Sequence, residues 1–213
     1  MRSYMVSGCS RGIGFELVRQ LADSKDDIVI FASARSCNNP KFQELLDQHP
    51  ERIVYVPLDV TDQVSIKNAA KIITSKLDGR GLDVLINNAG VLTYGLVEEI
   101  STTLGSISQQ SINRHVTAPS YKVTKAALNM LTVLYANELE KEGFTIFCVS
   151  PGWLKTDLGS DNADLPVEVG VKSILEILHE IGRDRNGQFL NIHVPGWENA
   201  PGMNQYDGKE VPW

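Results

Sequence analysis

The sequence predicts a single α/β domain over residues 1–213, with a doubly wound parallel sheet of the Rossmann type. Three observations predict it. An apolar run ends in a glycine-rich stretch, Ser7–Gly14, which opens a helical pattern. Apolar runs of strand length then alternate with helical patterns. Finally, the strands begin near residues 4, 28, 53 and 82, an even spacing that indicates repeated βα units.

The elements of the first half follow from apolar spacing. Continuous apolar runs predict buried parallel strands at residues 4–6, 28–32, 52–58 and 82–86. Apolar residues at helical spacing predict one helix from Ile13, another over Pro40–Gln48 and a third after residue 62. Either Thr61 or Asp62 can cap the third helix.

The alternation stops after Gly90. A parallel crossover needs a dozen or more residues, usually with a helix, and the stretch before Thr102 hardly holds one. We therefore expect one crossover helix to be missing after the fourth strand, and the fifth strand to be short or lost.

The second half predicts two more helices and two more strands. Pro119 suits the first turn of a long helix to about Lys141, with Thr117 as its cap. Residues 144–149 and 188–192 predict strands, and residues 166–182 predict a helix. The tail after Pro195 carries three aromatic residues, so we expect it to pack rather than to be disordered.

The composition limits the classes of function. The net charge of −6 and the pI near 5.2 argue against a nucleic-acid partner or an anionic membrane surface. No apolar run approaches the roughly 20 residues of a membrane helix, and the first strand leaves no room for a signal peptide. Three scattered cysteines suggest a reduced, cytoplasmic protein. The four histidines lack metal-ligand spacing, so we expect no metal site.

The glycine-rich stretch predicts a phosphate site. Gly8 lets the chain turn sharply off the strand, while Gly12 and Gly14 allow backbone to approach a ligand and helix to approach sheet. The helix that follows would point its free N–H groups at a pyrophosphate. The spacing is not that of the commonest dinucleotide loop, and an ordinary tight turn explains this stretch alone equally well.

Residues at later strand ends favour NADP over NAD. No acidic residue lies between Phe31 and Pro40, whereas Arg35 does, and Arg11 sits in the glycine loop. Two guanidinium groups can hold a 2′-phosphate, although both could also be solvated surface side chains. Asp59 is placed to accept from an adenine amino group or to act as a second capping acid. The small and amide residues 87–90 suit close cofactor approach or a simple turn.

Tyr121 and Lys125 are the candidates for acid–base chemistry. A tyrosine has an ordinary pKa near 10, and an ammonium one helical turn away favours the phenolate and lowers that pKa. Such a tyrosine can donate its proton to a carbonyl oxygen. The alternative is a surface pair on an amphipathic helix.

These motifs in this order resemble the short-chain dehydrogenase/reductase family over essentially the whole chain. The ordered set comprises Ser7-Gly8-x-x-x-Gly12-Ile13-Gly14, Asp59-Val60, Asn87-Asn88-Ala89-Gly90, Tyr121-x-x-x-Lys125 and Pro151-Gly152-x-x-x-Thr156. Residues 151–157 and the ending 206–213 look like the carbonyl-reductase branch that includes the myxobacterial C-factor and many fungal oxidoreductases.

The resemblance implies a role for each matching residue. Tyr121 would be the acid–base group, and Lys125 would lower its pKa and bind the nicotinamide ribose. Thr102 stands where the family has a serine that orients the substrate carbonyl, and Ser106 or Ser108 could substitute. The implied NADP-binding residues are Gly8, Ser10, Arg11, Gly12, Ile13, Gly14, Arg35, Asp59, Val60, Asn88, Ala89, Gly90, Tyr121, Lys125, Pro151, Gly152, Leu154 and Thr156.

The missing crossover helix is the main departure from the family. It would normally hold an asparagine of the catalytic tetrad, cover the long helix and form a dimer surface with it. Its loss should expose apolar area and puts the family's homodimer in question. The join near residues 99–101 looks like an internal excision, such as a splice variant or gene-model error.

The sequence thus predicts an NADPH-dependent carbonyl reductase that acts on a ketone or aldehyde. The alternative is an NADP-binding protein with impaired catalysis and a binding or partner role. We expect a small-molecule substrate, without nucleic-acid or membrane partners.

Overall fold

The computed structural model describes residues 1–89, 101–201 and 204–213. The chain groups into two compact units, Met1–Ala89 and Gly90–Trp213, and each is described by itself. No helix among the described residues is long and apolar enough to cross a membrane.

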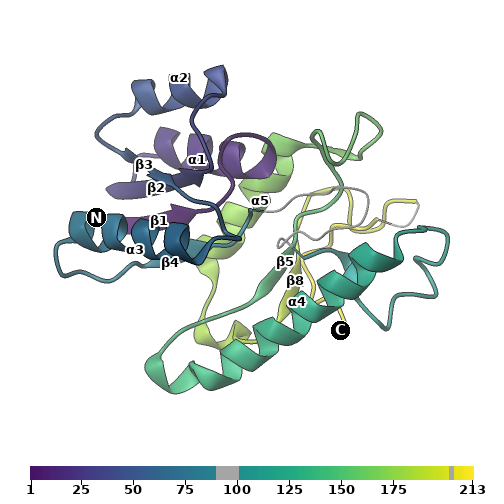
Figure 1. Cartoon of the computed structure of the whole chain (residues 1–213). Helices are drawn as coiled ribbons and strands as arrows, with labels where there is room; N and C mark the ends of the chain where they lie inside the picture. Colours follow the sequence, from purple (N-terminus) through teal and green to yellow (C-terminus); the bar gives the residue numbers. More distant parts are fainter. Residues whose placement is uncertain (90–100, 202–203) are drawn as a thin grey trace. The chain divides into compact units, whose positions relative to one another are not determined.

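The first unit contains a four-stranded parallel sheet in the order β3-β2-β1-β4, which confirms the predicted parallel sheet (Figure 1). Tyr4 of β1 lies beside Ile30 of β2 and Val84 of β4. The strands are β1 (Arg2–Val6), β2 (Ile28–Ala34), β3 (Ile53–Pro57) and β4 (Val84–Ile86), and the helices are α1 (Gly12–Asp23), α2 (Pro40–Gln48) and α3 (Gln63–Leu77).

Alternation along the strands divides the core of the first unit between the two faces of the sheet. On one face, Phe31 and Val56 pack against Ala69, Ile73 and Leu77 of α3. The intervening strand residues point to the opposite face, where α1 contacts β1 and β2 and α2 contacts β3. The sheet is therefore covered on both faces, as its nearly continuous apolar strands predict.

Local signals fix the starts of α2 and α3. Asn39 accepts hydrogen bonds from the N–H groups of Lys41 and Phe42, and Pro40 occupies the first helical position of α2. Of the two predicted caps of α3, Asp62 is the one used, because its carboxylate accepts from the N–H of Val64.

The second unit is built around α4 and two short pairs of parallel strands. The strand β5 pairs with β8, and β6 pairs with β7. The helix α5 contacts β6 and β7. The elements are η1 (Thr103–Gly105), α4 (Pro119–Glu138), η2 (Glu140–Glu142), β5 (Cys148–Ser150), β6 (Leu154–Lys155), β7 (Leu165–Pro166), α5 (Val167–Glu180), η3 (Arg183–Arg185) and β8 (Phe189–Asn191).

Two predicted elements of the second unit are corrected. The long helix ends at Glu138, and its N-cap is Ala118 rather than Thr117, without a side-chain cap. Residues 144–147 lie outside any strand, since the ladder to β8 begins only at Cys148. Residues 101–118 contain no strand, which agrees with the expectation that the fifth strand is short or lost.

The aromatic tail packs, as predicted. Trp213 stacks on Phe189 at a centroid distance of 5.5 Å, and Tyr206 is buried. Isolated bridges join Glu210 to Leu190 and Asp207 to His193. The C-terminal residues therefore contribute core to the second unit.

Candidate active site

The glycine-rich turn of the first unit is tied to the end of β4. Gly8 has a φ of +73°, a conformation that favours glycine. The Ser7 hydroxyl accepts from the N–H groups of Asn88 (3.0 Å) and Ala89 (2.8 Å), and the Asn88 amide donates to the Ser7 carbonyl. The structure thus brings Gly8, Asn88 and Ala89 together at one edge of the sheet.

Gly14 serves the packing of this turn. A Cβ added at Gly14 would lie 2.4 Å from the Gly8 carbonyl oxygen and 2.3 Å from the Asn88 amide nitrogen. The glycine therefore lets the first turn of α1 lie directly against the turns that follow β1 and β4. Its role is the close approach of helix to sheet, as predicted.

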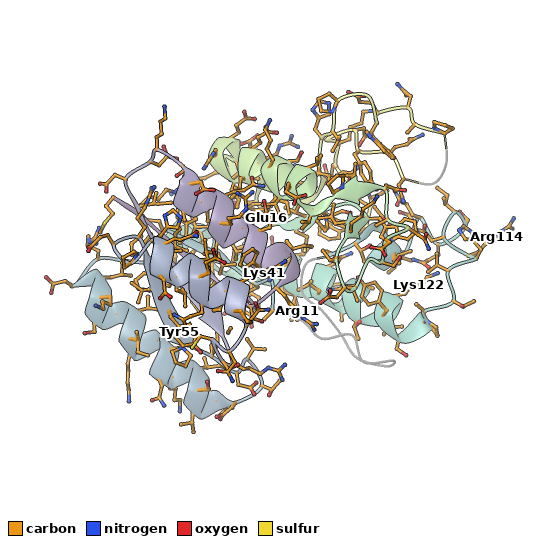
Figure 2. The ribbon with its side chains drawn as sticks, turned by 90° about the horizontal axis from the view of Figure 1, so that it is seen from above. Arg11, Glu16, Lys41, Tyr55, Arg114 and Lys122 are labelled. Carbon is orange, nitrogen blue, oxygen red and sulfur yellow. The ribbon has the colours of Figure 1, made fainter. Side chains whose placement is uncertain are left out.

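The start of α1 presents donors suited to an anion. Arg11, at the N-cap, is exposed and makes no side-chain cap bond (Figure 2). Gly12 follows with a φ of +59°, and Ser10 and Ile13 are half-buried beside it. An N-terminus of this kind combines backbone N–H groups with the positive end of the helix dipole, which suits a phosphate group.

The ends of β2 and β3 carry the other candidates of this unit. Arg35 is exposed directly after β2, and Val60 is exposed after β3. The Asp59 carboxylate accepts from the hydroxyl and N–H of Thr61, which lower its pKa, and Arg35 lowers that pKa further. Asp59 therefore closes a local turn and does not cap α3.

Tyr121 and Lys125 lie one turn apart on α4, in the second unit. Lys125 is fully buried, and its ammonium nitrogen lies 5.6 Å from the centre of the Tyr121 ring. Tyr121 itself is half-buried. The alternative of a solvated surface pair is therefore wrong for Lys125. Lys122 lies on the same helix, but its ammonium group donates to the Asn113 carbonyl. The side chain of Arg114 projects away from the helix (Figure 2).

The turn that Thr102 begins packs on α4 at Lys125. Thr102 is the N-cap of η1, and its hydroxyl oxygen accepts from the N–H of Leu104 at 3.4 Å. A Cβ added at Gly105 would lie 2.7 Å from the Lys125 Cβ, so this glycine permits the contact. The structure thus joins the Thr102–Gly105 turn to the helix that carries Tyr121 and Lys125.

Ser106, one of the two serine alternatives to Thr102, contacts the C-terminal tail. The Ser106 hydroxyl donates to the Pro212 carbonyl at 2.5 Å, and it lies 3.2 Å from the Ser108 hydroxyl. Ser106 is fully buried. This side chain therefore anchors the C-terminal tail.

The turn after β5 is fixed by the tail. Pro151 and Leu154 are buried, Gly152 has a φ of +82°, and the Thr156 hydroxyl accepts from the N–H of Gly159. The Tyr206 hydroxyl accepts from the N–H of Trp153 at 3.1 Å.

Tyr206 is also bound to the loop before β7. Its hydroxyl donates to the Asp164 carboxylate at 2.7 Å, and burial together with this carboxylate raises the Tyr206 pKa. Sequence reasoning used Tyr206 as one of the tail's aromatic residues and as part of the resemblance, and it missed the contact of Tyr206 with this turn.

A second residue that sequence reasoning missed is Asn129, one turn beyond Lys125. Its side chain is buried and bonds to both Ser101 and Gly105. Its position four residues after Lys125 is the signal that could have revealed it, because such residues share a helix face.

Gly90 and most of the suspected excision near residues 99–101 lie outside the described residues. The predictions about them are therefore untested. Among the described residues, no group of three or more His, Cys, Asp or Glu side chains could hold a metal ion.

Two family models match this chain. Residues 3–105 match a model described as short chain dehydrogenase, and residues 100–174 match one described as enoyl-(acyl carrier protein) reductase. A short-chain dehydrogenase/reductase of Arthrinium sp is 30% identical over 215 residues, covering 78% of this chain and 79% of that protein. The C-signal protein of Myxococcus xanthus is 29% identical, covering 62% of this chain and 93% of its own.

Solved structures show the same fold. The NADPH-bound carbonyl reductase from chicken fatty liver aligns with a TM-score of 0.85 and 30% identity, covering 100% of this chain and 99% of that one. The carbonyl reductase Sniffer of D. melanogaster also has a TM-score of 0.85, with 22% identity and complete coverage of both chains. The second likeness concerns the fold alone.

Proposed function

This chain belongs to the short-chain dehydrogenase/reductase family, and on that premise we propose that it is an NADP-dependent carbonyl reductase. It would transfer a hydride between NADPH and a ketone or aldehyde, with Tyr121 as the acid–base group. The observation that carries the proposal is the buried Lys125 ammonium, 5.6 Å from the centre of the Tyr121 ring. The similarity to a carbonyl reductase at 30% identity supports this reaction class.

The residues of the first unit fit the phosphate-bearing part of NADP. The start of α1 offers backbone donors without a side-chain cap, which suits a pyrophosphate beside Gly8, Ser10, Gly12, Ile13 and Gly14. Arg11 and Arg35 are both exposed cations, and we assign them to the 2′-phosphate. Asp59, Val60, Asn88, Ala89 and Gly90 would face the adenosine.

The residues of the second unit fit the reacting part. Tyr121 and Lys125 would bind the nicotinamide ribose, and residues 151–156 would hold the carboxamide through Pro151, Gly152, Leu154 and Thr156. The bound cofactor supplies the hydride. Residues 151–156 lie on a short turn held by hydrogen bonds, which suits them to hold a planar amide in one orientation.

Residues of this chain would supply the proton that the substrate carbonyl oxygen accepts. The Tyr121 hydroxyl would donate its proton to the carbonyl oxygen as that oxygen gains negative charge. The Lys125 ammonium favours the resulting phenolate through its positive charge, which acts strongly because the group is buried. The Thr102 hydroxyl would donate a hydrogen bond to the same carbonyl oxygen and so fix its direction.

The missing crossover helix remains part of the proposal. The alignment with an uncharacterized oxidoreductase of Schizosaccharomyces pombe extends over 264 positions while taking in 99% of this 213-residue chain, so this chain is gapped against that relative. This supports an internal loss. The impaired, binding-only alternative is not favoured by the similarity to carbonyl reductases. We further propose a cytoplasmic location, which the three free cysteines support.

The test is NADPH oxidation by the purified full chain with a panel of aldehydes and ketones. We expect Tyr121→Phe to lower kcat by about 10²–10⁴-fold, the usual range for general acid–base catalysis. The same variant should keep its NADPH affinity, measured by the thermal stabilisation that NADPH produces. Tyr135→Phe, at an exposed tyrosine of the same helix, is the matched control and should retain the wild-type rate.

Two results would contradict the proposal. Near wild-type turnover in Tyr121→Phe would remove Tyr121 from its role. Stabilisation of the wild-type protein by NADPH without turnover of any carbonyl would instead support the binding-only alternative.

A further inference from the structure

The turn that begins with Thr102 is held from both ends by one buried side chain of α4. The Asn129 amide oxygen accepts from the Ser101 hydroxyl at 2.5 Å, and its amide nitrogen donates to the Gly105 carbonyl at 3.3 Å. Ser101 directly precedes Thr102, and Gly105 ends η1. Asn129 therefore bridges the two ends of the short segment that presents Thr102.

From this geometry we propose that Asn129 is a positioning residue, which sets the direction of the Thr102 hydroxyl toward the substrate carbonyl. The inference rests on the proposed function, because it presumes that Thr102 acts in carbonyl reduction. Asn129 itself would touch neither substrate nor cofactor. It would act only through the turn.

The chemistry of the amide explains why asparagine suits this position. One side chain must accept a hydrogen bond from a hydroxyl and donate one to a carbonyl, and an amide does both. Asn129 and Ser101 are 4% and 2% exposed, so water cannot easily replace either partner. A buried polar group that loses its partner cannot regain that hydrogen bond from water, so this arrangement is strongly preferred.

The helix face that carries Asn129 also connects the turn to the acid–base pair. Tyr121, Lys125 and Asn129 occupy three successive turns of α4, at intervals of four residues. The backbone of Gly105 lies against Lys125, where an added Cβ would be 2.9 Å from the Lys125 carbonyl carbon. One helix face therefore fixes the position of Tyr121, Lys125 and the Thr102 turn relative to one another.

The test compares Asn129→Leu with Asn186→Leu. Asn186 is a matched control, since its amide also donates to a carbonyl and accepts from an N–H, but near the far end of α4, at Ala136 and Ile146. We expect Asn129→Leu to lower kcat by about 10–100-fold, the scale of a misplaced group near the chemistry, with KM for NADPH near the wild-type value. Asn186→Leu should lower the melting temperature but leave kcat unchanged in the folded protein.

A double variant separates positioning from general destabilisation. If Asn129 acts through Thr102, Asn129→Leu should cause no further loss of kcat in a Thr102→Ala background. Asn129→Asp keeps the acceptor for Ser101 and loses the donor for Gly105, so it should recover part of the lost rate. An equal loss of kcat in both backgrounds would overturn the inference.

Hydrogen exchange provides a readout that does not depend on activity. The N–H groups of Gly105 and Ser106 donate to the carbonyls of Thr102 and Thr103, and both bonds belong to the turn. Their exchange should become faster in Asn129→Leu and not in Asn186→Leu. Unchanged exchange in Asn129→Leu would overturn the inference, whereas absent wild-type turnover would overturn only the proposed function.

Discussion

At the scale of single residues, this chain places glycine where no side chain fits. Gly14 lies inside the first turn of α1, where alanine would otherwise be the better helix former. The neighbouring Gly8 carbonyl and Asn88 amide occupy the space that a methyl group would need. Steric contact therefore outweighs helix propensity at this position.

Gly14→Ala should destabilise the protein by about 1–3 kcal/mol, because overpacking forces backbone to move. Gly81→Ala is the control, since no atom lies within 4 Å of a Cβ added there and its φ is not in the left-handed region. That change should be neutral or slightly stabilising. Urea unfolding measures both. A Gly14→Ala protein as stable as wild type would show that the turn can shift without cost.

Asp83 gives a second prediction at this scale, for pH. The hydroxyl and N–H of Ser3 both donate to its carboxylate, at 2.6 and 2.7 Å, and lower its pKa. Because the folded pKa lies below the unfolded value near 3.9, the stabilisation is complete above that pH and is lost as the pH falls through the folded pKa. The carboxylate is exposed, so we expect less than about 1 kcal/mol.

Asp83→Asn should therefore lower the free energy of unfolding at neutral pH. As the pH falls below about 4, the free energy of unfolding should decrease less in this variant than in the wild-type protein. Ser3→Ala, which removes one donor, should reproduce part of this change. The measurement is urea unfolding over a series of acidic pH values. Parallel pH curves for wild type and Asp83→Asn would contradict the assignment.

At the scale of elements, the C-terminal tail determines the shape of the turn between β5 and β6. Tyr206 is buried against Gly152, and its hydroxyl connects the Trp153 N–H to the Asp164 carboxylate. The ring of Trp197 also packs against Tyr206, at a centroid distance of 5.3 Å. The tail therefore fixes a turn that we assign to the nicotinamide carboxamide.

Tyr206→Phe should cost about 1–3 kcal/mol of stability, because it leaves the Trp153 N–H and the Asp164 carboxylate without this partner. It should also raise KM for NADPH more than it lowers kcat, since Leu154 and Thr156 follow directly on the loosened turn. Thermal unfolding and steady-state kinetics measure the two effects. An unchanged KM for NADPH would show that the tail serves stability alone.

At the scale of the whole molecule, the long helix α4 buries mostly polar side chains and exposes several apolar ones. Its buried residues are Lys125, Asn129, Thr132 and Ala136. An outer apolar stripe lies on the other side of the helix and comprises Val123, Met130, Leu131 and Leu134, which are 48–68% exposed. The described residues of α4 therefore expose apolar area, while the loss of a crossover helix stays a prediction.

Met130→Glu with Leu134→Lys should leave the free energy of unfolding within about 0.5 kcal/mol of wild type, because these side chains contribute little buried area. The new pair at i, i+4 also favours the helix. Self-association, measured by light scattering, should fall. Leu128→Glu is the control, since Leu128 packs against the core cluster of Cys148, Phe189 and Val211 and should not tolerate a charge. A clear loss of stability in the double variant would show that the outer stripe is covered.

Much of the fold could be predicted because its signals are local. The bounds of α2 are those predicted, since Asn39 and Pro40 mark its start. By contrast, residues 144–147 form an apolar run without a strand, because strand formation depends on a distant partner that begins pairing only at Cys148. The predicted cap of α4 was also wrong. Thr117 is a residue type that often caps helices, but the N-cap is Ala118 and no side chain caps this helix.

The sequence by itself determined the strands and helices of the first unit, the glycine turn and the Tyr121–Lys125 spacing, because the signal for each lies in residues a few positions apart. Only the tertiary structure decided that Lys125 is buried, that Gly105 lies against it, and that Asn129 and Tyr206 hold two turns of the site. These contacts join residues 20 or more positions apart, such as Ser101 with Asn129 and Trp153 with Tyr206. Their geometry depends on how the chain packs, which no local pattern specifies.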